Sequence, residues 1–264
     1  MNFSLRKFFV RADPAYTAAV AQYQATTPSS KALNLLLHLL PGVLAYALIN
    51  VATVHAAGLA LTRLSDPNYQ AMVLVFVTLV WHAGVPFVVL TQVDRLTPRA
   101  AIAFLGLDRW DRKGLLVIVP LAFILYTLVS LPFMKYVYGP LGAAINSVPV
   151  LRTPDWVIFQ DARVYNLAPG FLVLLAVGNF VGEEVYFRGY LLKKIGFLGR
   201  WAWVVNSLLF AFYHVWQPAM TWPLAALSLA FGFLMQCRKT LAPLILFHFL
   251  ANVVWGAIIG MVLQ

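Results

Sequence analysis

The chain has 264 residues, of which 62% are hydrophobic and 11% are charged, and its formal net charge is +10. This composition excludes an ordinary water-soluble domain, because repeated apolar runs of about 20 residues are typical of membrane-spanning helices. The single cysteine, Cys237, excludes an internal disulfide framework, and the chain has no CxxC or Cys/His spacing of a metal site.

The basic residues are divided unevenly between the two sides of the predicted membrane. We followed the apolar runs in order and assigned their ends to alternating sides. Of the 19 Lys and Arg residues, those that then fall opposite the N-terminus are only Arg63, Lys135, Arg152 and Arg163. Positive charge collects on the cytoplasmic side of membrane proteins, so this bias predicts a cytoplasmic N-terminus. The net charge therefore reflects membrane topology, and we expect the lipid bilayer rather than nucleic acid as a partner.

The predicted fold is an all-α, polytopic integral membrane helix bundle. Residues 1–31 are expected to form a basic cytoplasmic leader, and residues 32–264 a single transmembrane domain. The first apolar run contains Pro41 and is long enough for a kinked or tilted helix. Dividing that run in two would raise the count from about seven spans to eight. The seven expected spans cover residues 32–61, 69–90, 115–137, 171–192, 201–216, 222–237 and 241–262.

The fourth span carries the only two glutamates of the chain, Glu183 and Glu184, followed by Arg188. An ionisable side chain at the centre of a membrane helix costs roughly 2.5–3.5 kcal/mol on insertion scales, so such residues usually serve a function. Residues i and i+4 share a helix face, which lets Glu184 pair with Arg188 and directs Glu183 elsewhere. Gly178 and Gly182 form a GxxxG pattern that allows another helix to approach closely. We interpret Glu183 as free for chemistry; the alternative is a buried structural cluster of all three ionisable residues.

Two further pairs of residues lie in later spans. FAFYH places Phe210 and His214 four residues apart, and HFLAN does the same for His248 and Asn252. At a rise of about 1.5 Å per residue, the two histidines and Glu183 lie roughly 13–20 Å from basic residues at the ends of their spans. We therefore expect them to converge near the middle of the bilayer, in a cavity open to the cytoplasm. A carboxylate, two imidazoles and a carboxamide can activate water and stabilise an oxyanion.

In order, EEVYFR, FAFYH and HFLAN resemble the EExxxR, FxxxH and HxxxN/D motifs of the CAAX-protease and bacteriocin-processing family of intramembrane proteases. This family includes the type II CAAX prenyl endopeptidases, and the resemblance covers about residues 170–256. It implies an intramembrane endopeptidase in which Glu183 and His214 activate the hydrolytic water. By the same resemblance, His248 and Asn252 would bind the oxyanion of the tetrahedral intermediate. The residues that would support the site are Glu184, Arg188 and Phe210.

The resemblance leaves metal dependence open, because members of this family are often called metalloproteases. Glu183, His214 and His248 could ligate zinc, with water in the open position. However, the chain has no HExxH motif, and Asn252 is an uncommon zinc ligand. We favour glutamate-dependent hydrolysis without a cofactor, with Zn²⁺ as the alternative.

Two other functions are compatible with the same residues. A transporter or channel could use Glu183 and Glu184 to relay protons or bind a cation, although the chain shows no evident inverted repeat. A non-catalytic immunity or scaffold protein could keep the polar cluster for packing. Our prediction is a protease of a plasma membrane or bacterial inner membrane that acts on a membrane-associated or lipid-anchored peptide or protein. Prenylated proteins, bacteriocin precursors and sorted surface proteins all fit as substrates.

Overall fold

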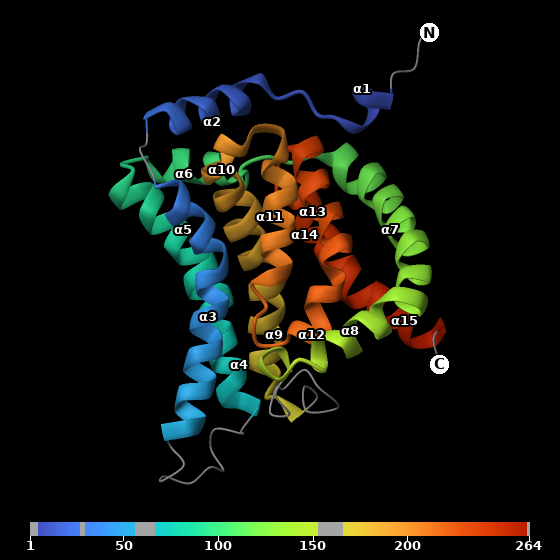
Figure 1. The fold of residues 1–264 in the computed structure, drawn as a ribbon. Coiled ribbons are helices and arrows are strands. Elements are labelled where there is room, and N and C mark those ends of the chain that lie inside the picture. The colour runs from blue at the N-terminus through green and yellow to red at the C-terminus, as the bar shows by residue number, and fades with distance from the viewer. Residues whose placement is uncertain (1–4, 27–29, 56–66, 153–165, 263–264) are drawn as a thin grey trace.

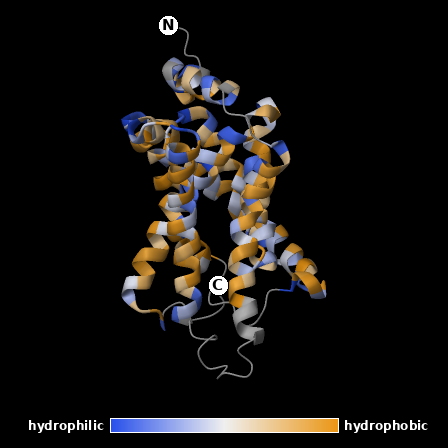
Figure 2. Cartoon of the chain, turned by 90° about the vertical axis from the view of Figure 1, so that its left-hand side faces the viewer, coloured by the Kyte–Doolittle hydropathy of each residue, from blue (hydrophilic) through white to orange (hydrophobic). Residues whose placement is uncertain are grey.

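The computed structural model describes residues 5–26, 30–55, 67–152 and 166–262. Within these ranges the regular secondary structure is helical, and six helical runs are long and apolar enough to cross a membrane. Six such helices indicate an integral membrane protein, as the composition predicted. Figure 2 shows hydrophobic residues along most of the length of these helices. The six runs are Lys31–Ile49, Asn68–Val93, Gly114–Asn146, Pro169–Lys194, Pro218–Arg238 and Ala242–Val262.

The first half of the chain forms two helices across one end of the bundle and three of the long runs (Figure 1). The two crossing helices are α1 (Leu5–Phe9) and α2 (Pro14–Thr26). The others, in chain order, are α3 (Lys31–His55), α4 (Pro67–Val75), α5 (Val85–Val88), α6 (Pro98–Leu105), α7 (Val119–Phe133) and α8 (Gly139–Asn146). Continuous helical turns join α4 to α5 and α7 to α8.

The second half supplies the other three long runs. One run begins with α9 (Pro169–Val177), widens to a π-helix over Gly178–Gly182 and Glu184–Leu191, and ends with α10 (Leu192–Lys194). The later helices are α11 (Ala202–Phe212), α12 (Pro218–Thr221), α13 (Ala225–Arg238), α14 (Ala242–Phe249) and α15 (Trp255–Val262). We call the end of the bundle with α1, α2, α6 and α10 the N-terminal end, and the end with α8 and α12 the distal end (Figure 1).

The predicted fifth span is shorter than a membrane-crossing helix. It corresponds to the apolar stretch Gly196–Phe212, which starts with a 3-10 turn and continues as α11. Gly199 interrupts the first turn at a φ of 55°, a conformation that favours glycine. The described residues therefore hold six long spans and this shorter helix, where the sequence predicted about seven spans or eight. The end of the first predicted span, residues 56–61, lies outside the described residues.

Two glycines bring the helix that carries the glutamates against the helix that contains Thr78. A Cβ on Gly178 would overlap the Thr78 side chain, and a Cβ on Gly182 would overlap its backbone carbonyl oxygen. This contact confirms the prediction from the GxxxG pattern that another helix approaches closely here. Because Glu183 follows Gly182 directly, the same contact fixes the backbone from which the carboxylate projects.

A buried ion pair ties the N-terminal segment to the rest of the bundle. Arg238 donates from Nη2 to Asp111 Oδ1 at 2.6 Å and from Nε to Oδ2 at 2.7 Å, while its Nη1 donates to the carbonyl of Phe9 at 2.8 Å. Burial alone raises the pKa of Asp111. The hydrogen bonds from Arg238 and the Gly114 N–H, with the charges of Arg238 and Arg11, outweigh burial and lower this pKa below its ordinary value.

Candidate active site

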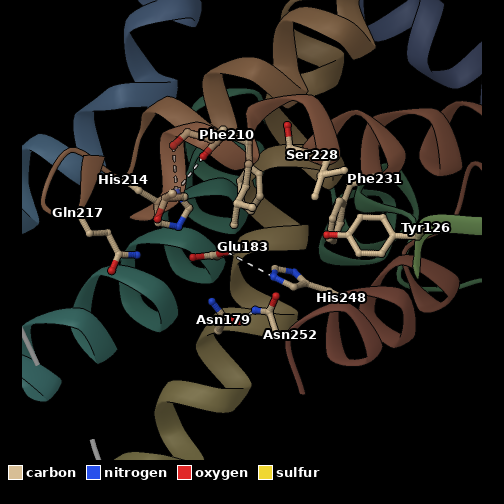
Figure 3. A pocket seen from close by; sticks show the side chains of 14 residues that line it. Tyr126, Asn179, Glu183, Phe210, His214, Gln217, Ser228, Phe231, His248 and Asn252 are labelled. Atoms are coloured by element: carbon tan, nitrogen blue, oxygen red, sulfur yellow. Dashed lines mark hydrogen bonds and ion pairs between the residues drawn. The ribbon is translucent and has the colours of Figure 1, made fainter. Parts of the chain in front are cut away.

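The four predicted catalytic residues line one cavity of about 230 Å³ (Figure 3). They come from three helical runs: Glu183 from the run that begins with α9, His214 from the turn after α11, and His248 and Asn252 from the run that begins with α14. The structure therefore brings together side chains separated by up to 69 positions. Glu183, His214 and His248 are all buried. Their convergence matches the expectation from the motif positions.

Glu183 is held by a neighbour that the sequence analysis did not single out. The hydroxyl of Tyr213 donates a hydrogen bond to Glu183 Oε1, while the second oxygen, Oε2, is buried and has no hydrogen-bond partner. Both side chains are almost fully buried, and Tyr213 also packs against His214 with ring centroids 4.0 Å apart. Tyr213 thus fixes one carboxylate oxygen, and the other accepts no hydrogen bond from the protein.

Glu184 faces away from the cavity and joins two other predicted residues. Its Oε1 lies 3.2 Å from Arg188 Nη1, which confirms the predicted i, i+4 ion pair. The same oxygen lies 2.8 Å from His248 Nδ1, so Glu184 orients the imidazole. His248 Nε2 then points towards Glu183 and lies 3.9 Å from its Oε2. One carboxylate therefore anchors both the arginine and the histidine, and the other is left on the cavity side.

The Arg188 guanidinium lies close to two aromatic rings. Its central carbon lies 3.9 Å from the centre of the Phe210 ring and 5.1 Å from that of Phe231. A cation over an aromatic ring is stabilised by the negative face of the π-system. Phe210 thus supports the site through its ring, by keeping Arg188 against Glu184.

The backbone of α11 sets the tautomer of His214. Its Nδ1 lies 3.1 Å from the carbonyl oxygen of Phe210 and 3.3 Å from that of Ala211 (Figure 3). A carbonyl oxygen can only accept, so Nδ1 carries the proton and Nε2 of the neutral ring is left as an acceptor. The orientation of the His214 ring is therefore fixed by backbone carbonyls at the end of α11.

Asn252 contacts a second carboxamide that the motifs did not include. Its Nδ2 donates to Asn179 Oδ1 at 2.8 Å, and both side chains line the cavity. Asn179 lies four residues before Glu183, so the i, i+4 rule could have placed it on the same face. Gln217 also lines the cavity, three residues after His214. It lies in the turn that ends before α12. Helical periodicity does not apply in a turn, so it could not predict that Gln217 lines the cavity.

The site extends towards the distal end of the bundle. A second cavity of about 540 Å³ shares Glu183, His214 and Asn252 with the first and reaches Tyr138 and Met220, next to α8 and within α12. On the other side of Glu183, the next turn of its helix, including Phe187 and Arg188, is buried and fills the interior. The larger cavity thus extends towards the distal end, whereas the sequence analysis expected an opening on the side of the basic helix ends; the assignment of that side to the cytoplasm stays a prediction. The sequence analysis measured only how far the motif residues lie from the basic ends of their helices. That distance does not show which side of Glu183 is filled by packed side chains.

The donor set does not fit the zinc alternative. Among the described residues, no group of three His, Cys, Asp or Glu side chains is placed to hold a metal ion, and Glu183, His214 and His248 are described. Each side chain is instead hydrogen-bonded outside this set of three: Glu183 to Tyr213, His214 to backbone carbonyls and His248 to Glu184.

Comparison with known proteins gives one match. A family model described as type II CAAX prenyl endopeptidase Rce1-like matches residues 165–254, which contain all three motifs. No curated protein and no solved structure matches the chain. The family match agrees with the resemblance drawn from the motifs, and membership of this family implies intramembrane protease activity. Residues 165–254 form a domain of the Rce1-like type II CAAX prenyl endopeptidase family.

Proposed function

We propose that the protein is an intramembrane endopeptidase that hydrolyses a peptide bond of a membrane-associated or lipid-anchored substrate without a metal. The observation that carries this proposal is the arrangement of Glu183, which has one oxygen fixed by Tyr213 and the other on the side of a cavity shared with two histidines. A carboxylate held in this way has an oxygen available for a water molecule, the nucleophile that hydrolysis needs.

In the proposed reaction, Glu183 and His214 position and deprotonate the attacking water. The water oxygen bonds to the scissile carbonyl carbon while its proton passes to this pair. The tetrahedral intermediate then breaks its C–N bond, and the same proton is returned to the leaving amine. Nε2 of His214 suits this role because Nδ1 already carries a proton that is committed to the backbone.

His248 and Asn252 are proposed to stabilise the charge that develops on the scissile carbonyl oxygen. The Asn252 amide has a second N–H beyond the one that it donates to Asn179. His248, held by Glu184 through Nδ1, presents Nε2 towards the cavity and can donate from that atom when protonated. Donors fixed before the reaction stabilise an oxyanion without a cost of reorganisation, and loss of one such donor typically reduces kcat by about 10²–10³-fold.

The substrate is proposed to enter from the distal end, where the larger cavity reaches α12. The bias of basic residues supports a cytoplasmic N-terminal end, and the proposed entrance would then face the opposite compartment. A test replaces Cys237 by Ala and introduces a cysteine at Ser147, an exposed distal residue, or at Arg99, an exposed residue of α6. A membrane-impermeant maleimide added to intact cells should label only the first variant; labelling of only the second would reverse the proposed orientation.

Hydrolysis itself can be tested with purified protein in lipid vesicles and a quenched fluorescent peptide that carries a farnesylated cysteine in a CAAX tail. We expect wild type to cleave it and Glu183→Gln to lose cleavage. Asp108→Asn makes the same change from carboxylate to amide at an exposed residue and should retain cleavage. Proton flux into the vesicles that depends on Glu183, without peptide cleavage by wild type, would instead favour the transporter.

A further inference from the structure

We propose that three carboxamides, Gln217, Asn179 and Asn252, form a subsite that hydrogen-bonds the main chain of an unwound substrate segment. This inference rests on the proposed function and adds to it how the peptide is held. We call the three side chains the carboxamide subsite. Two of its members, Gln217 and Asn179, lie outside the motifs that suggested the catalytic residues.

A peptide bond within a helix must lose its regular hydrogen bonds before water can attack it, because the helix surrounds the carbonyl carbon with backbone and side chains. In an apolar environment each unpaired backbone N–H or C=O then costs several kcal/mol. A protease that works inside the bilayer therefore needs groups in its own cavity that replace these bonds. A carboxamide suits this need, because it offers an acceptor oxygen and two N–H donors without a net charge.

Gln217 meets the requirement most directly. Its Oε1 is buried and has no hydrogen-bond partner, although buried polar atoms are normally paired. Its side chain lines both cavities together with Glu183 and His214, and Figure 3 shows it on the same side of the cavity as His214. An acceptor held next to the catalytic groups without a protein partner is suited to a backbone N–H of the substrate.

The backbone around Gln217 is firmly held. Its N–H donates to the carbonyl of His214 at 3.1 Å, and its own carbonyl accepts from Met220 and Thr221 at 3.1 and 3.0 Å. The residue therefore keeps a defined place relative to His214. A side chain on such a turn can bind a substrate without first ordering the loop that carries it.

Asn179 and Asn252 supply complementary groups on other helices. The bond from Asn252 Nδ2 to Asn179 Oδ1 leaves the Asn179 NH₂ group and the Asn252 Oδ1 available. Both residues line the same two cavities as Gln217. Donors and acceptors thus lie around Glu183, as an extended strand with alternating N–H and C=O groups requires. The chemistry favours a substrate segment that is extended and uncharged at the cleavage site.

The test uses the farnesylated peptide in a series in which one backbone N–H near the scissile bond at a time is replaced by an ester oxygen. With wild type, we expect kcat/KM to fall roughly 10-fold at one or two positions, because a hydrogen bond is lost there. Gln217→Met and Asn179→Leu keep the approximate side-chain size without the carboxamide. Each should cleave the all-amide peptide with a raised KM, and Gln217→Met should no longer respond to the ester at the position that it contacts.

Ser228→Ala is the matched control. Ser228 also lines the smaller cavity, but its hydroxyl is already bonded to the carbonyls of Ser207 and Ala225, both at 2.7 Å. This variant should keep the wild-type pattern of ester sensitivity. An unchanged ester pattern in Gln217→Met, or an unchanged KM in Asn179→Leu, would overturn the subsite while leaving Glu183-dependent hydrolysis intact. Absence of cleavage by wild type would overturn the proposed function itself, and the subsite with it.

Discussion

Replacing Tyr213 by Phe removes a single atom next to Glu183 and tests whether the orientation of this carboxylate matters for catalysis. The hydroxyl donates to Glu183 Oε1, and Tyr213 is not among the residues that line either cavity. The ring that packs against His214 is retained. A hydrogen bond to a charged group contributes about 1.5–3 kcal/mol. If catalysis depends on the full bond, kcat should fall by about 10- to 100-fold, while KM stays near its wild-type value.

The assay is steady-state cleavage of the reporter peptide by protein in vesicles, with folding checked by thermal denaturation in detergent. Tyr186→Phe is the matched control, because Tyr186 is also buried and its hydroxyl donates to the carbonyl of Leu37 at 2.8 Å, outside the catalytic cavity. That variant should lose a little stability and keep its kcat. A Tyr213→Phe protein with wild-type kcat, or with a loss confined to KM, would refute the claim that Tyr213 orients Glu183.

Three further predictions concern packing, pH and metal. Gly182→Ala places a Cβ against the Thr78 carbonyl and should destabilise the protein by about 1–3 kcal/mol, whereas Gly170→Ala, with open space around it, should be neutral or stabilising in denaturation experiments. Because its pKa is lowered, Asp111 stabilises the fold at neutral pH, and this contribution should decline below about pH 4. Asp111→Asn should lower stability at pH 7 by about 3 kcal/mol, since it leaves Arg238 buried without its partner, and the difference from wild type should shrink in acid. Cleavage should survive treatment with a zinc chelator; its loss, with recovery on added Zn²⁺, would contradict the metal-free proposal.

Features governed by helical periodicity could be predicted from the sequence. The Glu184–Arg188 pair depends only on which residues share a face of one helix. The spacing of Gly178 and Gly182 likewise indicates a face that another helix can approach, although it does not identify the helix of Thr78 as the partner. Composition likewise was sufficient to predict a helical membrane protein. These features could be predicted because their signals are residue spacing and composition, which need no knowledge of how the helices pack.

Features that depend on packing between helices could not be predicted in the same way. The bond from Tyr213 to Glu183 requires the turn after α11 to face the helix of the glutamates. The Asn252–Asn179 bond joins two helical runs whose relative rotation no single-helix pattern specifies. The direction in which the cavity opens depends on which side of Glu183 is filled by packed side chains. From the sequence alone, a bulky residue such as Phe187 could either line the cavity or fill the interior, and the structure shows that it is buried.

The most direct test of the central claim compares protein termini in native membranes that carry either the wild-type protein or Glu183→Gln at matched expression. The account predicts new termini that appear only with the wild type and that lie within or next to membrane-associated segments. Such termini would establish proteolysis and identify the substrate in one experiment. Identical sets of termini in the two membranes, with both proteins folded and the natural substrates present, would contradict a protease that depends on Glu183.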